Sequence, residues 1–292
     1  MRVNVYQKIT DELVKAMSGD LLPWRKSWEG SFLPRNGHSQ RLYQGINVPY
    51  LWSVAVRKKF KTNEWYTYKG ALQAGGNVMR GQKAVAYAVY WKLVEKNVNR
   101  VRAHEEKNVF PLIRTYPLWN RDQVEGMEHV EPFDIEPETK MALDHVGQLG
   151  YEVREGSPGY LPDTDMLEMP PIDAFDSEEE YLGTLFHELA HWTGHSSRLN
   201  RRLGNDDRAY EELVAELASC YACGWFNISR GEGSSAYLKS WTESMGEDNR
   251  YIFKAGKDAM NAARYLLGSP PELAAFEIGN PSPKDTPWTD KE

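Results

Sequence analysis

Apolar residues recur every three or four positions in several segments of the chain, a spacing that predicts amphipathic helices. The segments with this pattern are 5–17, 48–60, 139–150, 177–195, 210–226, 235–245 and 249–268. The helix at 177–195 has the clearest signals. Ser177 is followed three residues later by Glu180, which indicates a capped start, and Gly194 marks a natural end.

Two other segments, 83–95 and 109–119, are rich in β-branched and aromatic residues and predict strands that pair across a polar connection. A short strand followed by a helix is expected at 65–76, and another strand at Met166–Met169. Strands with helices in the first part and mainly helices in the second indicate an α+β fold.

An acidic stretch at 122–138 contains two prolines and separates these two parts. We therefore expect an N-terminal domain at 1–125, an acidic linker at 126–138 and a C-terminal domain at 139–292, which closes with a Pro-rich tail. The charge divides in the same way. Residues 1–121 carry 21 Lys or Arg and 8 Asp or Glu, a net charge of +13, whereas the remainder carries −20. Such an asymmetry suggests domains with different partners, and the basic half attracts polyanions such as nucleic acid.

Composition excludes several protein classes. No apolar run approaches the length of about 18 residues that a membrane span requires, so no membrane partner is expected. The N-terminus lacks the features of a secretory signal, which favours a cytoplasmic location. The only cysteines, Cys220 and Cys223, are three apart on a predicted helix and are most simply core residues.

The predicted helix at 177–195 contains the sequence His-Glu-Leu-Ala-His. His187 and His191 are four positions apart and therefore share one helix face, where both imidazoles reach one cation. Glu188 is rotated by about 100° and is placed to accept a proton from an activated water. This pattern indicates a catalytic divalent metal, with Zn²⁺ expected first and Mn²⁺ as the alternative.

A catalytic zinc needs a third protein ligand. His195 follows His191 by four residues, but Gly194 interrupts the helix before it. Glu212 and Glu216, four apart on the next long helix, are better candidates. One of them binds the metal while the other orients a ligating histidine through its second nitrogen. In the competing interpretation, the histidines are ordinary core residues and the glutamates lie on a solvated helix face.

The pair of stretches "HELAHW" and "ELVAEL" resembles the gluzincin metallopeptidases. This resemblance implies that Glu212 is the third ligand and that Glu216 takes the place of an aspartate behind the ligands. Because this chain has glutamate at that place, the two roles could also be exchanged.

The basic half contains six tryptophans, several of them beside Lys or Arg. Aromatic rings stack on exposed bases while cations follow the phosphates, so this combination favours single-stranded DNA over duplex. Most tryptophans in a domain of this size are core residues, and Trp52 and Trp91 are expected there. The candidate DNA-contacting residues are Arg25, Lys26, Trp28, Lys58, Lys59, Trp65, Tyr66, Arg80 and Lys83.

Six stretches, among them "YQGINVPYLW", "WYTYKGALQAGGNVMRGQKAV" and "TLFHELAHWTGHSSRLNR", resemble the ArdC-type antirestriction proteins of conjugative plasmids. The resemblance implies an N-terminal domain that binds single-stranded DNA and a mainly helical, zincin-like metallopeptidase domain. It also implies a role in protecting incoming plasmid DNA from host restriction.

Three functions are compatible with these features. The first is a zinc-dependent metallopeptidase that acts on a protein substrate near DNA. The second is a binding protein with a structural or vestigial metal site. The third, an acidic DNA mimic, fits the charge of the C-terminal half, but the basic N-terminal half argues against it.

Overall fold

A computed structural model describes residues 4–17, 22–25, 32–97, 107–127, 137–201, 208–230 and 236–268, and only the backbone of residues 92–97 and 107–112. The N-terminal part contains α1 Val5–Met17, η1 Pro23–Arg25, β1 Arg35–Asn36, α2 Asn47–Lys58, β2 Glu64–Tyr66, α3 Tyr68–Gln73, β3 Asn77–Val78, β4 Ala86–Asn97, β5 Lys107–Asn120, η2 Arg121–Gln123 and β6 Val124–Glu125. The C-terminal part contains α4 Thr139–Val146, β7 Glu152–Glu155, β8 Gly159–Leu161, β9 Met166–Met169, η3 Ile172–Ala174, α5 Glu178–Thr193, α6 Arg208–Trp225, α7 Leu238–Glu247 and α8 Tyr251–Leu266.

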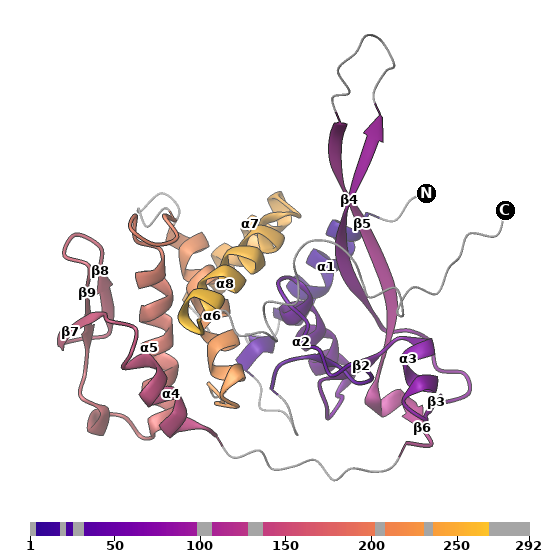
Figure 1. Cartoon of the computed structure of the whole chain (residues 1–292), viewed down its shortest axis with the longest axis horizontal. Helices are drawn as coiled ribbons and strands as arrows, with labels where there is room; N and C mark the ends of the chain where they lie inside the picture. The colour runs from indigo at the N-terminus through magenta and orange to yellow at the C-terminus, as the bar shows by residue number, and fades with distance from the viewer. Residues whose placement is uncertain are drawn as a thin grey trace.

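The N-terminal part is built on a four-stranded sheet with the order β1-β2-β5-β4. The predicted pairing of the two long strands is confirmed, since β4 and β5 are antiparallel, with Ala86 opposite Leu118 and Tyr90 opposite Arg114. Their hairpin projects from the body of the molecule (Figure 1). Helix α2 contacts β4, and α3 contacts β2, β3 and β5.

The C-terminal part is mainly helical, as the sequence predicts. Helix α6 packs against both α5 and α8, and a small sheet with the order β7-β9-β8 lies beside α5 (Figure 1). The predicted strand at Met166–Met169 is confirmed as β9. Strands β7 and β8 are not predicted from the sequence, because their residues lack a buried apolar alternation and all four residues of β7 are exposed.

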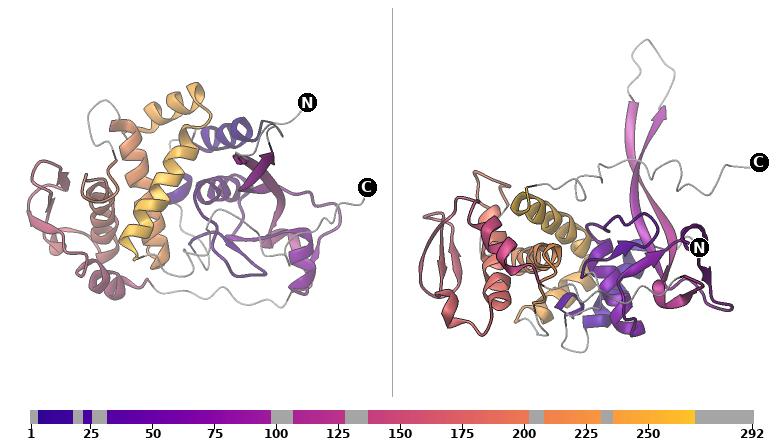
Figure 2. Two further views of the ribbon diagram at one scale, coloured as in Figure 1. Left: turned by 45° about the horizontal axis from the view of Figure 1, so that its top comes forward. Right: turned by 60° about the horizontal axis from the view of Figure 1, so that its bottom comes forward.

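The two parts share one hydrophobic core. A single cluster of buried residues runs from Ile9 in α1 to Leu267 after α8. At the boundary, Tyr6 packs edge-on against Phe253 with ring centroids 4.7 Å apart. The hydroxyl of Tyr221 donates a hydrogen bond to the Gly45 carbonyl at 3.2 Å. Helix α7 contacts α1, and the two lie side by side in Figure 1 and Figure 2. The N-terminal part therefore packs against α7 and α8 and against α6, the helix that carries Glu212 and Glu216.

A substitution at Gly256 in α8, where the two parts pack closely, tests the shared core. A β-carbon at Gly256 would lie 3.2 Å from the Ile46 nitrogen, across the boundary, whereas Gly246 in α7 has nothing within 4 Å of that position. We expect Gly256→Val to lower the free energy of unfolding by about 1–3 kcal/mol through overpacking.

The matched substitution Gly246→Val should change the free energy of unfolding by less than about 0.5 kcal/mol, because valine and glycine differ little in helix propensity. Urea denaturation followed by circular dichroism measures both. Equal effects of the two substitutions would contradict close packing at this boundary.

Candidate metal centre

The two histidines of the metal motif lie on one face of α5. The helix starts where the sequence predicts, because the Ser177 hydroxyl accepts a hydrogen bond from the Glu180 amide at 3.2 Å, and it ends before Gly194. The Glu180 carboxylate accepts a hydrogen bond from the Asp176 amide instead of the Ser177 amide, so only one of the two bonds of the predicted capping box forms. The rings of His187 and His191 are 4.9 Å apart and edge-on.

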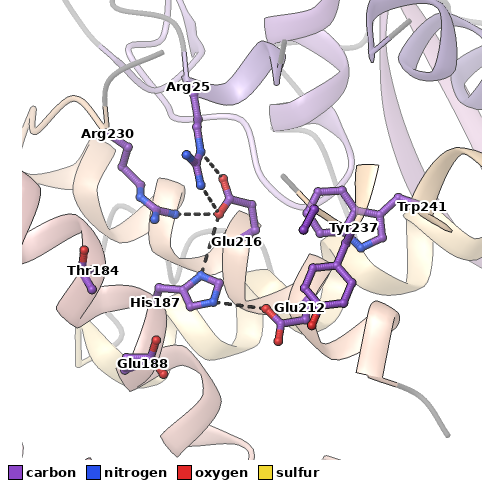
Figure 3. A pocket seen from close by; sticks show the side chains of 10 residues that line it. Arg25, Thr184, His187, Glu188, Glu212, Glu216, Arg230, Tyr237 and Trp241 are labelled. Atoms are coloured by element: carbon purple, nitrogen blue, oxygen red, sulfur yellow. Dashed lines mark hydrogen bonds and ion pairs between the residues drawn. The ribbon is translucent and has the colours of Figure 1, made fainter. Parts of the chain in front are cut away.

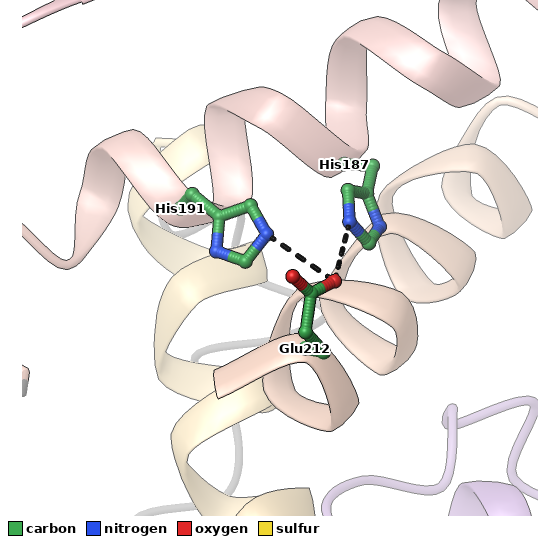
Figure 4. Close-up of side chains that lie close together, drawn as sticks. All are labelled: His187, His191 and Glu212. Carbon is green, nitrogen blue, oxygen red and sulfur yellow. Dashed lines mark ion pairs between the residues drawn. The ribbon is translucent and has the colours of Figure 1, made fainter. Parts of the chain in front are cut away.

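Glu212 is the carboxylate that α6 brings to both histidines. Its Oε2 atom is 3.4 Å from His187 Nε2 and 3.8 Å from His191 Nε2. One ligand atom from each of the three residues lies within 4.8 Å of the other two (Figure 4). Two imidazoles and one carboxylate are a donor set typical of catalytic zinc sites, so these residues fit a divalent cation.

A second carboxylate, Glu211, stands behind His191 and was missed by the sequence analysis. Its Oε1 atom is 3.3 Å from His191 Nδ1, on the side of the ring away from Glu212. Arg201 holds Glu211 with two hydrogen bonds, of 2.7 and 3.0 Å. A carboxylate in this position fixes the ring and leaves Nε2 facing the cluster, where it could bind a cation. Glu211 directly precedes Glu212, but the sequence alone does not show which of the adjacent carboxylates faces a histidine.

Glu216 stands behind His187 rather than in the cluster. Its Oε2 atom is 3.8 Å from His187 Nδ1, which is buried and has no hydrogen-bond partner among the described residues. Glu216 is bound by Arg230 at 2.9 Å and by Arg25 at 2.7 and 2.9 Å (Figure 3). The alternative in which Glu216 is the third ligand is therefore not the arrangement found.

Arg25 lies in η1, so the N-terminal part supplies one of the two guanidinium groups on Glu216. Its neighbour Trp24 is fully buried and anchors η1, which contacts both α2 and α6. The prediction that Arg25 contacts DNA is corrected, because its side chain is occupied by a buried carboxylate.

Charge pairing sets the ionisation of these groups. Burial disfavours the charged form of His191, but hydrogen bonds to Glu211 and Glu212 outweigh it and raise the pKa of His191 to about 9. Burial also opposes ionisation of Glu216, yet Arg230 and Arg25 lower its pKa to about 2. The pKa of Glu212 is held well below its ordinary value because His187 and His191 outweigh its burial. The carboxylates are therefore ionised, and in the absence of a cation a proton on His191 balances part of their charge.

Glu188 lines a cavity of about 290 Å³ next to the cluster (Figure 3). It is 8% exposed and takes part in no ion pair among the described residues. Tyr237 and Trp241, with stacked rings 6.2 Å apart, line the same cavity together with Thr184 from α5. His195 lies outside the cluster, because its Nδ1 contacts the Ser197 hydroxyl at 2.8 Å.

The predicted DNA contacts have mixed outcomes. Lys58, Lys59, Arg80 and Lys83 are exposed, whereas Lys26 and Trp28 lie outside the described residues. The prediction for Trp65 and Tyr66 is wrong, because these side chains are 0% and 3% exposed. They lie on β2, between β1 and β5. Trp65 packs against Phe60, and the chain at Gly37 covers the Tyr66 ring.

None of the helices in the described part of the chain has the length and apolar character needed to cross a membrane. A family model of zincin-like metallopeptidases matches residues 144–258, and a model of the N-terminal domain of the anti-restriction factor ArdC matches residues 3–119. The metal-free crystal structure of the antirestriction protein ArdC from plasmid R388 is 31% identical, covers 94% of this chain with 100% of its own, and has a TM-score of 0.77. The chain belongs to the ArdC family of antirestriction proteins.

Another structure of the R388 protein and two further proteins are also similar to this chain. The Mn(II)-bound structure of the R388 protein has a TM-score of 0.73 at the same identity and coverage, which supports a divalent metal in the family. The DNA primase TraC of Escherichia coli is 30% identical over 90% of this chain, but the match spans only 27% of TraC. The uncharacterized protein y4eC of Sinorhizobium fredii is 28% identical over 94% of this chain and 95% of its own length.

Metal binding to this ArdC-family chain should depend on pH. Because the pKa of His191 is raised to about 9, a cation must displace its proton at neutral pH. We expect the apparent association constant for Mn²⁺ to fall about tenfold per pH unit as pH decreases from 8.5 to 7. Isothermal titration calorimetry in buffers of different ionisation enthalpy would measure the released proton. A constant affinity over this range would contradict the protonated state of His191.

Glu211 should contribute to metal affinity although it does not face the cluster. In Glu211→Gln, His191 loses an anionic acceptor, and we expect Mn²⁺ affinity to fall by about 10- to 100-fold. The control Glu168→Gln removes a carboxylate from an exposed pair with Arg154 and should leave the affinity unchanged. Circular dichroism verifies folding. Equal affinities of the two variants would show that Glu211 does not orient the ligand.

Proposed function

We propose that this chain protects incoming plasmid DNA from host restriction by binding single-stranded DNA and cleaving a peptide bond at the His187–His191–Glu212 centre. Membership of the ArdC family supports the antirestriction role. The observation that carries the catalytic part is the arrangement of Glu188 in a cavity beside a complete three-residue donor set. Zn²⁺ is the proposed ion, and the Mn(II)-bound relative makes Mn²⁺ the alternative.

The donor set suits hydrolysis better than a purely structural role. Structural zinc sites are usually closed by four protein ligands, whereas this cluster offers three among the described residues and faces a cavity. When bound, a divalent cation supplies a Lewis acid that makes water nucleophilic at neutral pH. Two of the proposed ligands, His187 and Glu212, line this cavity, so a bound cation would act where a substrate has access.

Glu188 is the proposed general base and acid. On α5 it directly follows His187, so its carboxylate reaches the cavity from the edge of the donor set. There it accepts a proton from the attacking water and delivers it to the leaving amine. Its absence from ion pairs among the described residues contrasts with Glu211 and Glu216, whose carboxylates are bound by arginines.

Tyr237 is the proposed hydrogen-bond donor to the oxyanion of the reaction, a role for which the sequence suggested no residue. It lines the same cavity as Glu188 and comes from the start of α7, on the far side of Glu212 (Figure 3). A tyrosine hydroxyl at this wall is a suitable donor to a developing oxyanion. The Trp241 ring stacked on it restricts its motion and gives the cavity an apolar surface for a substrate side chain.

The N-terminal part is the proposed DNA-binding unit. Its charge of +13 over residues 1–121 favours a polyanion, and the exposed Lys58, Lys59, Arg80 and Lys83 are the proposed phosphate contacts among the described residues. The single-stranded form is proposed because the aromatic content of this half suits unpaired bases.

Glu188→Gln tests the catalytic proposal. We expect the variant to retain its metal and its DNA binding, but to lose protection of transferred plasmid DNA by about 10²-fold or more, the usual contribution of a general base. Protection is measured as the ratio of plasmid transfer into restricting and non-restricting recipients. His187→Ala serves as the control that loses the metal. Full protection by Glu188→Gln would favour the alternative function, a DNA-binding protein with a non-catalytic metal site.

A further inference from the structure

Helix α3 presents two large apolar side chains to solvent. Tyr68 is 56% exposed and Leu72 is 48% exposed. They are four residues apart and therefore lie on the same face of the helix. The preceding Trp65 and Tyr66 are buried, so this short segment changes from interior to surface within two residues. An exposed apolar pair of this kind indicates a contact surface more often than isolated surface residues do.

Trp119 lies against Tyr68 and extends this surface onto the sheet. The two ring centroids are 5.9 Å apart and the contact is edge-on. Trp119 stands near the end of β5, where it pairs in register with the buried Tyr66 of β2. The sheet therefore fixes Trp119, and Trp119 in turn positions Tyr68. An edge-on contact holds a ring in place without covering both of its faces. The exposed Tyr68 ring therefore still offers a face to a flat ligand, whereas Trp119 is half-buried.

Exposed lysines lie on the segments that adjoin the two rings. Lys69 follows Tyr68 on α3 and is exposed. Lys83 is exposed, and its carbonyl accepts a hydrogen bond from Gln123, four residues after Trp119, at 3.1 Å. Neither lysine takes part in an ion pair among the described residues. Residues 57–83 and 113–125 together carry nine Lys or Arg and three Asp or Glu, so the local charge favours an anionic partner.

We propose that Tyr68 and Trp119 form a stacking site for unpaired DNA bases, with Lys69 and Lys83 contacting the flanking phosphates. Leu72 packs against a sugar or a base edge on the same face. This proposal rests on the proposed DNA-binding function. Tyr68 and Trp119 replace the buried Trp65 and Tyr66 as the candidate stacking residues. Single-stranded DNA is the occupant, because ring-on-ring stacking requires base faces that a duplex covers.

Tyr68→Ala is the test. Fluorescence anisotropy with a labelled single-stranded oligonucleotide should show a loss of affinity of about 5- to 150-fold, the range for one lost base stack. Tyr68→Phe keeps the ring and should bind within about twofold of the unmodified protein. Tyr265→Ala is the matched control. It removes the other exposed tyrosine, 41% exposed on α8, and should have no effect.

Salt dependence separates stacking from charge. Tyr68→Ala should leave the slope of log affinity against log salt unchanged, whereas Lys69→Ala should reduce it by about one phosphate contact. Tyr68→Ala with normal affinity would overturn this site while leaving DNA binding intact. An equal loss for duplex would also overturn it. Absence of single-strand binding by the unmodified protein would overturn the proposed DNA function and the site with it.

Discussion

Compensation of buried negative charge organises the candidate metal centre. Glu211 and Glu216 are 4% and 3% exposed, and an uncompensated carboxylate in such surroundings costs several kcal/mol. Arg201 neutralises Glu211, and Arg25 with Arg230 neutralises Glu216. Each carboxylate thereby remains ionised behind one histidine. The His187 and His191 rings are thus held by an outer layer of charge pairs and not only by their contacts with Glu212.

This outer layer links the two parts of the chain. Arg201 and Arg230 come from the C-terminal part, but Arg25 reaches Glu216 from η1, 191 residues earlier in the sequence. The buried Trp24 keeps η1 against the core, so packing in the N-terminal part sets the position of a charge beside His187. The electrostatics of the centre therefore depend on hydrophobic packing between the two parts. A substitution that shifts η1 would also move the Arg25 charge beside His187.

The sequence was most informative where the signals are local. The start and end of α5, the pairing of β4 with β5 and the placement of His187 beside His191 all follow from short-range spacing. The choice between Glu212 and Glu216 did not follow, because both lie on α6 and only the rotation of that helix against α5 decides which carboxylate meets the rings. Glu211 was overlooked for the same reason.

The predictions that proved wrong fall in short segments without a hydrophobic periodicity. Strand β2 has three residues, too few for an alternating pattern to show that Trp65 and Tyr66 face the interior. Arg25 next to a tryptophan suggested a nucleic-acid contact, because nothing in the local sequence reveals a carboxylate on a distant helix. These side chains are placed by long-range contacts, which neighbouring residues do not encode.

The undivided hydrophobic core also bears on how such chains evolve. A gene fusion that carried only one half would lack part of the cluster that runs from Ile9 to Leu267. The remaining half would then expose apolar side chains. The matching region of the much longer TraC spans 90% of this chain, including both halves. Either half alone is therefore expected to be less stable than the same half within the whole chain, because part of the shared cluster would lose its cover.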